Sequence, residues 1–269
     1  MNILRKFNRA PSVAALRITL GIVAGGLAAC GRPNEHVASG QPVDTEFIIS
    51  CHLSMTATEI QAVESLSIRG CADIDFQPLW DAQRLHTLRI YDPALDDISM
   101  VAPLRSLEVL RFEDSRVVDL APLGPIGNLK VLHVVDTPLA DIKPLARLGN
   151  LEELDIGDSY VTDLTPLSGH AYLHTLKAPR ARIDDLSVLN TLPALTTVDL
   201  SENGITDLAI LLGHPNLAAL ALDLRGNCIA VDDPAVQQLT KKLMESGARL
   251  HLGTQLPADE CSAGYFESD

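Results

Sequence analysis

The feature that most constrains this chain is a 22-residue repeat, which runs through most of its 269 residues. Aliphatic residues recur at steps of 22 in eight consecutive units, namely Val63, Leu85, Leu107, Leu129, Leu151, Leu173, Leu195 and Leu217. A second column stands three residues later, at Leu66, Leu88, Leu110, Leu132, Leu154, Leu176, Val198 and Leu220, and a third two residues after that, at Ile68, Ile90, Phe112, Val134, Ile156, Ala178, Leu200 and Leu222. Such a period indicates stacked, similar units rather than one compact core.

The spacing within each unit predicts its local structure. The second and third columns differ by two residues, which is the side-chain period of a β-strand, so we expect one short strand per unit. Only 4% of the chain is aromatic while 46% is hydrophobic, so the stacked core is expected to be aliphatic. Late in the unit stands a near-constant aspartate, at Asp75, Asp97, Asp119, Asp141, Asp163, Asp185 and Asp207. It is interpreted as the cap of a short 3₁₀ or helical turn rather than as part of a catalytic array.

These residues resemble the leucine-rich-repeat family, specifically the 22-residue subtype seen in internalins, from about Val63 to Ile229. The resemblance implies an α/β repeat fold. This fold is a solenoid with short parallel strands on its concave face, 3₁₀ or helical turns on its convex face and a cap at each end. It implies little about function, because such scaffolds carry many unrelated partners.

The repeat and its flanks suggest five segments. Residues 1–29 form a signal peptide, residues 30–46 a lipidated cysteine with a flexible tether, and residues 47–62 an N-terminal cap with a possible capping box from Thr56 to Glu59. About eight repeats fill residues 63–232, and residues 233–269 form a C-terminal cap. In that cap a helix is expected to open at Pro234 and to end at Gly247, followed by a final strand at Leu250 and Leu252.

The chain departs from the family at the asparagine that usually bonds backbone in the turn after the strand. This position reads Cys71, Pro93, Ser115, Thr137, Ser159, Ala181, Asn203 and Asn227. Serine and threonine can replace part of that hydrogen bonding, whereas Pro93 and Ala181 cannot, so we expect those two turns to be more irregular. The register also slips by two across Leu222–Asn227, which implies an insertion in the eighth unit.

The N-terminus reads as an export signal. Four cations and no acid accompany the apolar run Ile18–Ala29, which precedes Cys30. Twelve helical residues span about 18 Å, well short of a bilayer core of about 30 Å. Leu27-Ala28-Ala29-Cys30 resembles the lipobox of bacterial lipoproteins, which implies lipidation of Cys30, and Gly31 after it favours the outer membrane if the cell is Gram-negative. The alternative is an ordinary cleavage site that happens to precede a cysteine.

Four further cysteines lie near the two ends of the repeat, at Cys51, Cys71, Cys228 and Cys261. Export permits disulfides, and three pairings are possible in principle. Because the solenoid separates its ends, we expect Cys51 to pair with Cys71 and Cys228 with Cys261. A reduced metal site is the alternative, although the spacing matches no zinc pattern.

The net negative charge of the chain restricts the class of molecule that it can bind. Removing the signal peptide takes four cations and no acid from a chain of net charge −14, which leaves −18. Nucleic acid is therefore excluded as a partner, because phosphate binding needs a cationic face. A basic or metal-bridged partner fits this charge more easily.

The candidate binding residues lie at the exposed positions of the repeat, four to seven residues past its first leucine. Aspartates there form what we call the aspartate column, which consists of Asp92, Asp114, Asp136 and Asp158 and is interrupted by Arg180. Equivalent residues of stacked repeats lie about 5 Å apart, so these carboxylates would repel one another unless water, a cation or a basic group relieves them. We hypothesise that the column forms the partner-binding strip together with Arg89, Arg111, Tyr91 and His133. The alternative is a solvated acidic edge that nearby arginines neutralise.

Signals for an enzyme are weak. Gly157-Asp158-Ser159 resembles one block of a lipase family, but the serine occupies the asparagine position of the repeat. His170 and His174 are interpreted as surface histidines rather than metal ligands, because a strand begins between them. No phosphate loop, cofactor motif or metal motif is recognised. The sequence thus predicts a membrane-anchored cell-envelope protein that binds another protein or a glycan; the alternatives are a purely structural lipoprotein and a hydrolase.

Overall fold

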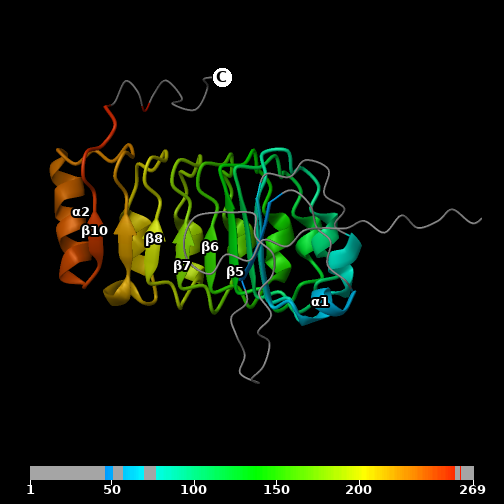
Figure 1. The fold of residues 1–269 in the computed structure, drawn as a ribbon. Helices are drawn as coiled ribbons and strands as arrows, with labels where there is room; N and C mark the ends of the chain where they lie inside the picture. Colours follow the sequence, from blue (N-terminus) through cyan, green and yellow to red (C-terminus); the bar gives the residue numbers. More distant parts are fainter. Residues whose placement is uncertain (1–45, 51–56, 70–76, 258–260, 262–269) are drawn as a thin grey trace, which may run out of the picture.

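The computed structural model describes residues 46–50, 57–69, 77–257 and 261. Within them ten short strands form one parallel sheet in chain order (Figure 1). The strands are β1 Glu46–Ser50, β2 Ser65–Arg69, β3 Thr87–Tyr91, β4 Val109–Glu113, β5 Val131–Val135, β6 Glu153–Asp155, β7 Thr175–Lys177, β8 Thr197–Asp199, β9 Ala221–Asp223 and β10 Arg249–His251. The predicted leucine-rich-repeat solenoid is confirmed.

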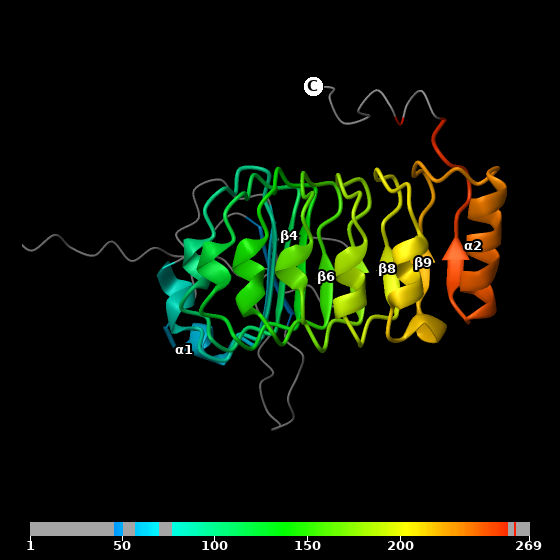
Figure 2. The same cartoon turned by 180° about the vertical axis from the view of Figure 1, so that it is seen from behind.

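Helical turns cover the face opposite the strands, as the view from behind shows (Figure 2). They are α1 Ala57–Ala62, η1 Gln77–Asp81, η2 Ser99–Val101, η3 Ala121–Leu123, η4 Lys143–Arg147, η5 Thr165–Leu167, η6 Ser187–Thr191, η7 Ala209–Gly213, η8 Leu217–Ala219 and α2 Pro234–Glu245, where η marks a 3₁₀ helix. The short α1 and the longer α2 lie at opposite ends of the solenoid. Among the described residues no helix is long and apolar enough to cross a membrane.

The core lies between the sheet and the helical turns and is almost entirely aliphatic. From β2 to β8, each strand pairs with the residues 22 positions later, so inward side chains stack on their own equivalents. These include Leu88, Leu110 and Leu132, each with 0% exposed surface. Burying a leucine contributes about 1.5–3 kcal/mol, and the repetition of this gain along the stack replaces the large anchors of a single core.

The predicted aspartate caps are confirmed wherever the structure describes them. Each carboxylate accepts a hydrogen bond from the backbone amide two residues later, for example Ala121 N to Asp119 Oδ1 at 2.8 Å and Thr165 N to Asp163 Oδ1 at 2.8 Å. The same hydrogen bond, from the amide two residues later, is made to Asp97, Asp141, Asp185 and Asp207. This contact satisfies an amide that the short helix leaves open at its start. Asp75 lies outside the described residues.

The asparagine position divides the solenoid into two parts. Asn203 and Asn227 are fully buried, and each bonds backbone in its own and the preceding turn. The expectation that hydroxyls replace part of this bonding holds for Ser159, whose Oγ donates to Ile156 O at 2.7 Å. The same expectation is wrong for Ser115 and Thr137, because their buried hydroxyls have no hydrogen-bond partner among the residues that the structure describes. A hydroxyl can make one of the bonds of the asparagine, as Ser159 does, but it cannot bridge two turns as an amide does.

The turn at Ala181 is as regular as its neighbours, so the expected irregularity there is wrong. Arg182 N donates to Val161 O at 3.0 Å, just as Tyr160 N donates to Leu139 O at 2.8 Å. These bonds are made by the backbone and do not need the asparagine side chain. The turn at Pro93 does differ, as described below for Asp92.

The insertion in the eighth unit is confirmed, but it precedes the strand. β9 pairs with β8 at an offset of 24 residues, so Leu222 lies beside Val198. The columns read from the sequence had instead placed Leu220 beside Val198. The extra turn η8 at Leu217–Ala219 takes up the two additional residues before β9 begins.

The C-terminal cap has its predicted helix and strand. Asp233 caps α2 by accepting from Ala235 N at 2.7 Å, and Pro234 occupies the first turn. Gly247 follows the helix with φ +100°, where a Cβ would lie 2.9 Å from Ala218 Cα. Residues 46–50, within and just before the predicted N-terminal cap, form the first strand of the sheet and pair with β2.

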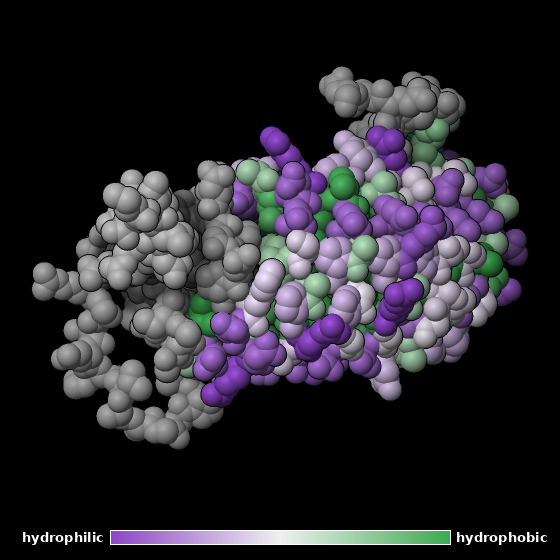
Figure 3. Space-filling view, turned by 90° about the vertical axis from the view of Figure 1, so that its right-hand side faces the viewer, coloured by the Kyte–Doolittle hydropathy of each residue, from purple (hydrophilic) through white to green (hydrophobic). Residues whose placement is uncertain are grey.

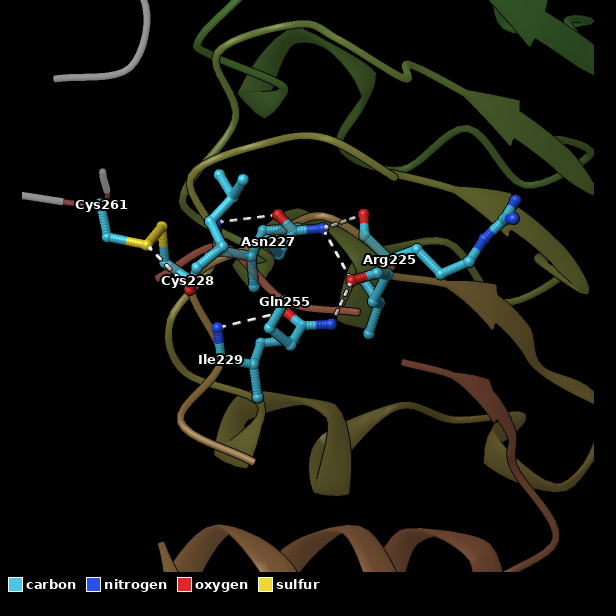
Figure 4. The surroundings of a disulfide bond; sticks show 9 residues. Arg225, Asn227, Cys228, Ile229, Gln255 and Cys261 are labelled. Atoms are coloured by element: carbon cyan, nitrogen blue, oxygen red, sulfur yellow. Dashed lines mark hydrogen bonds between the residues drawn. A yellow bond between two sulfur atoms is a disulfide. The ribbon is translucent and has the colours of Figure 1, made fainter. Parts of the chain in front are cut away.

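One predicted disulfide is present and joins Cys228 to Cys261, with 5.7 Å between their Cα atoms. Beside it Gln255 replaces the asparagine of a further turn, because its Oε1 accepts from Ile229 N at 3.3 Å and its Nε2 donates to Leu224 O at 3.0 Å (Figure 4). The C-terminal end is thus closed by an amide and a covalent bond together. Cys51 and Cys71, like Cys30, lie outside the described residues.

Candidate partner-binding site

The aspartate column follows the strands, at the edge of the sheet where the strands end, which we call the turn edge. Here Asp114, Asp136 and Asp158 adopt left-handed backbone with φ of 51°, 55° and 53°. The equivalent residues of the next repeats, Arg180 and Glu202, share this conformation. Aspartate and asparagine tolerate it better than most residues with a Cβ, so the backbone supplies one reason for the aspartates.

A backbone ladder of hydrogen bonds along the turn edge accompanies this conformation. The amide of each column residue donates to the carbonyl just before the next column residue, as in Asp136 N to Gly157 O at 3.1 Å and Asp158 N to Pro179 O at 2.9 Å. Gly226 ends the series with φ +65°, and a Cβ there would lie 2.9 Å from Glu202 Cγ. The column is therefore a structural feature of the turn, whatever else it does.

The side chains of the column have different surroundings. Arg180 binds both carboxylate oxygens of Asp158, at 2.5 and 2.6 Å, and lies 3.4 Å from Glu202, and the hydrogen bond to Asp158 raises the pKa of the guanidinium. Asp92 is only 5% exposed and accepts from Ala94 N at 2.9 Å in its own turn, where Pro93 follows it. Exposed carboxylates remain at Asp114 and Asp136.

Asp114, Asp136 and Asp158 line a polar hollow of about 590 Å³ together with Arg116, Tyr160 and Arg180. The buried hydroxyls of Ser115 and Thr137 lie in the same turns. Nowhere in the described residues do three or more His, Cys, Asp or Glu side chains lie close enough to hold a metal ion. The backbone ladder and Arg180 therefore account for most of this edge without a ligand.

A second line of charged residues crosses the concave face at the middle of each strand. We call it the concave column: Arg89, Arg111, His133, Asp155, Lys177, Asp199 and Asp223, which pair in register from β3 to β9. It begins with two arginines and ends with two aspartates. Neighbouring strands lie about 4.8 Å apart, so each member is close to the next.

Ion pairs connect the middle of the concave column. His133 Nε2 lies 2.8 Å from Glu153 Oε1, and Lys177 Nζ lies 3.6 Å from Glu153 and 3.9 Å from Asp155. Burial alone would raise the pKa of Glu153, but the hydrogen bond and charge of His133, with Lys177 and Arg111, lower it overall. Burial dominates at Asp155 and raises the pKa of that carboxyl. The centre of the concave face is therefore a fixed, largely neutralised network.

The predicted binding strip is divided by the structure into two parts. Arg89, Arg111 and His133 lie side by side on the concave face, and Tyr91 lies on the same strand as Arg89, where the Arg69 guanidinium stacks over its ring at 4.4 Å. The aspartates instead lie at the turn edge, and Asp92 is buried in its own turn. Reading the sequence by column alone missed Glu153, which stands two positions before Asp155 and completes the concave network.

Two sequence interpretations of other residues are corrected or limited by the structure. His170 is not a surface histidine: it is 3% exposed, and its ring nitrogens lie 2.8 Å from Leu167 O and 3.1 Å from Leu145 O. It occupies a position that is leucine in the repeats on either side. Ser159 is buried with its hydroxyl bonded to backbone, and Asp158 is bound by Arg180, so Gly157-Asp158-Ser159 lacks an exposed nucleophile.

The surface seen from the right of Figure 1 mixes hydrophilic side chains with smaller hydrophobic areas (Figure 3). The exposed large hydrophobic residues of the described chain are scattered over several turns: Trp80, Val118, Tyr160, Tyr172, Ile210, Leu212 and Met244. Scattered apolar side chains are normal for a protein surface. Charge therefore gives a more informative guide to recognition here than hydrophobicity.

No protein-family model matches the chain, and no curated protein matches it in sequence. Among solved structures, an internalin InlF from Listeria monocytogenes is similar with a TM-score of 0.62 at 23% identity, over 79% of this chain and 62% of that one. An internalin C2 from the same species is similar with a TM-score of 0.54 at 34% identity, over 60% of this chain and 72% of that one. The match to InlF spans 62% of that protein, which is less than two thirds of its length.

A third similar structure comes from a plant. It is the leucine-rich-repeat ectodomain of the Arabidopsis thaliana receptor kinase GASSHO1/SCHENGEN3 in complex with CASPARIAN STRIP INTEGRITY FACTOR 2. The TM-score is 0.51 at 21% identity, over 64% of this chain and 22% of that one. With the ten-stranded parallel sheet and its repeated turns, these similarities define a leucine-rich-repeat solenoid. The chain belongs to the leucine-rich-repeat family.

Proposed function

We propose that this chain is a membrane-anchored cell-envelope protein that recognises another protein through its concave column. The observation that carries the proposal is the order of charges there, with Arg89 and Arg111 adjacent at one end and Asp199 and Asp223 adjacent at the other. Like charges directly opposite on neighbouring strands destabilise a sheet. A partner that brings acids to the first pair and bases to the second would match this order of charges.

The two ends differ in how much of this charge the protein already neutralises. Asp223 is bound by Arg225 at 2.7 Å and lies 3.5 Å from His251, whereas among the described residues the Asp199 carboxylate accepts hydrogen bonds from Ser201 alone, at 2.7 and 3.0 Å. At the other end the buried Nε of Arg111 has no hydrogen-bond partner within the described part of the chain. We therefore expect Arg111 and Asp199 to contribute most to partner recognition.

The leucine-rich-repeat neighbours support a binding role rather than an enzymatic one. The plant ectodomain was solved in complex with CASPARIAN STRIP INTEGRITY FACTOR 2, and we assign the 22-residue repeat of this chain to the internalin subtype as part of this proposal. The signal-like segment before Cys30 supports lipid anchoring, and Gly31 favours the outer membrane in a Gram-negative cell. Two or more acyl chains at one site are enough for a stable anchor.

Charge reversal tests the recognition. The soluble chain from Gly31 is used to capture partners from envelope extract, and one reproducible partner is then titrated against variants. We expect Arg111→Glu and Asp199→Lys each to weaken binding about ten-fold, which corresponds to about 1.4 kcal/mol. Lys143→Glu on the convex turn η4, where the side chain is 78% exposed, is the matched control. Equal loss in all three variants, or no captured partner, contradicts the proposal and leaves a purely structural lipoprotein.

The anchor is tested separately in the native host. Cys30→Ser is expected to abolish labelling by a fatty-acid probe and to move the chain from the membrane to the soluble fraction. Retention in the membrane without label contradicts lipid anchoring.

Turnover by the purified chain in ester and glycoside panels would support the hydrolase alternative instead of a binding role.

A further inference from the structure

A second surface lies at the opposite edge of the sheet, where the strands begin. There a hollow of about 250 Å³ is lined by Glu108, Asn128, Lys130, Asn150, Glu152 and Tyr172, which we call the strand-start hollow. It arises from the repeat itself. Asn128, Asn150 and Tyr172 stand at one position of three consecutive repeats, and the charged residues stand immediately before β4, β5 and β6.

The two asparagines are held in place by the backbone. Asn128 Nδ2 donates to Arg105 O at 3.0 Å, and Asn150 Nδ2 donates to Gly127 O at 2.7 Å. Each amide thus uses its nitrogen within the protein, which leaves its oxygen as an acceptor. Fixed acceptors of this kind bind a hydroxyl donor without first losing side-chain freedom.

Two of the three charged groups that line the hollow are paired with each other. Lys130 Nζ lies 2.8 Å from Glu108 Oε2, and this hydrogen bond raises the pKa of the ammonium. Glu152 Oε2 lies 4.0 Å from Nε2 of His174, which carries a charge only when it is protonated. Because acid and base alternate along this edge, the hollow is suited to a neutral polar group rather than to a free ion.

Tyr172 supplies an open aromatic face beside these polar atoms, with 61% of its surface exposed. Tyr160 is a natural comparison, because it is similarly exposed at 49% but the Arg182 guanidinium stacks over its ring at 4.7 Å. An aromatic ring next to fixed hydroxyl acceptors matches a sugar ring, which has an apolar C–H face and a rim of hydroxyl donors.

We propose that the strand-start hollow binds a neutral pyranose unit of a polysaccharide. Tyr172 stacks on the ring, while the Oδ1 atoms of Asn128 and Asn150 and the carboxylate of Glu152 accept from its hydroxyls. The hollow is smaller than the roughly 300–1,000 Å³ of sites for drug-sized ligands, so it accommodates about one ring. This activity goes beyond protein recognition and uses none of the concave column.

Saturation-transfer NMR tests the proposal with the chain from Gly31 and four neutral trisaccharides: maltotriose, cellotriose, mannotriose and chitotriose. We expect at least one of them to give signals at concentrations up to about 10 mM, with the affinity reduced at least about ten-fold by Tyr172→Ala. Tyr160→Ala is the matched control and should leave binding unchanged, because its ring face is already occupied. Arg111→Glu should also leave it unchanged, which separates this site from the concave column.

Three results would overturn the proposal. These are no signal from any of the four probes, binding that survives Tyr172→Ala, and an equal loss in the Tyr160→Ala control. If Tyr172→Ala instead weakens capture of a protein partner while no sugar binds, the edge is a protein contact and the sugar site is rejected. Circular dichroism of each variant verifies that the solenoid remains folded.

Discussion

The buried asparagine of the turn gives the sharpest prediction about stability. Asn203 has no exposed surface, and its amide makes three backbone hydrogen bonds: to Ala178 O at 2.8 Å, to Ser201 O at 3.1 Å and from Ile183 N at 3.0 Å. Each such bond contributes about 1 kcal/mol net, and a buried group left unpaired costs about 1–3 kcal/mol. We therefore expect Asn203→Ala to lower the free energy of unfolding by about 3 kcal/mol.

The measurement is urea and thermal unfolding of the chain from Gly31. In a domain of this size 1 kcal/mol shifts Tm by about 2–4 °C, so we expect a decrease of about 6–12 °C. Asn128→Ala is the control, because that exposed side chain makes a single bond to Arg105 O. A loss at Asn203 no greater than the loss at Asn128 would refute the assignment of stability to the buried amide.

Three further predictions follow from other contacts. Replacing both Cys228 and Cys261 by serine should destabilise the oxidised chain by about 4 kcal/mol for a separation of 33 residues, and an unchanged urea midpoint would count against the disulfide. Asp136→Val should cost about 1–2 kcal/mol at φ 55° in thermal unfolding, whereas Asp136→Asn should be nearly neutral; equal effects would refute the backbone account of the column. The folded protein lowers the pKa of Glu153, so the ionised carboxylate stabilises the fold at every pH above 4.5, the ordinary pKa of glutamate. This stabilisation is lost as the pH falls through the lowered pKa of the folded state. Glu153→Gln should therefore be less stable than wild type near pH 7 and equal to it in acid, and a difference independent of pH would contradict this.

The sequence predicted the buried parts of the fold well because their spacing repeats without interruption. Leu88 and Leu110 occupy equivalent places because packing demands the same side chain in each unit. The caps such as Asp119 were predictable for the same reason, since their hydrogen bond spans only two residues. Local contacts and repeated contacts leave a clear pattern in a sequence.

The candidate site was less predictable because it depends on backbone conformation and on lateral neighbours. The left-handed φ of Asp136 cannot be read from the residue type alone, so the sequence did not show that the backbone itself favours aspartate in this column. Glu153 was missed because its partners His133 and Lys177 come from the preceding and the following strand. His170 was assigned to the surface although it replaces a buried leucine and bonds two carbonyls, a substitution that hydrophobic periodicity does not reveal.

The central claim is that the concave column, and not the convex face, contacts a protein partner. Photo-crosslinking on intact cells tests it most directly, with a photoreactive residue at Thr197 on β8 or at Val118 in the turn before η3, where 54% of the side chain is exposed. The account predicts one discrete crosslinked protein from Thr197 and none from Val118. Crosslinks from Val118 alone, or the same products from both positions, would contradict recognition by the concave face.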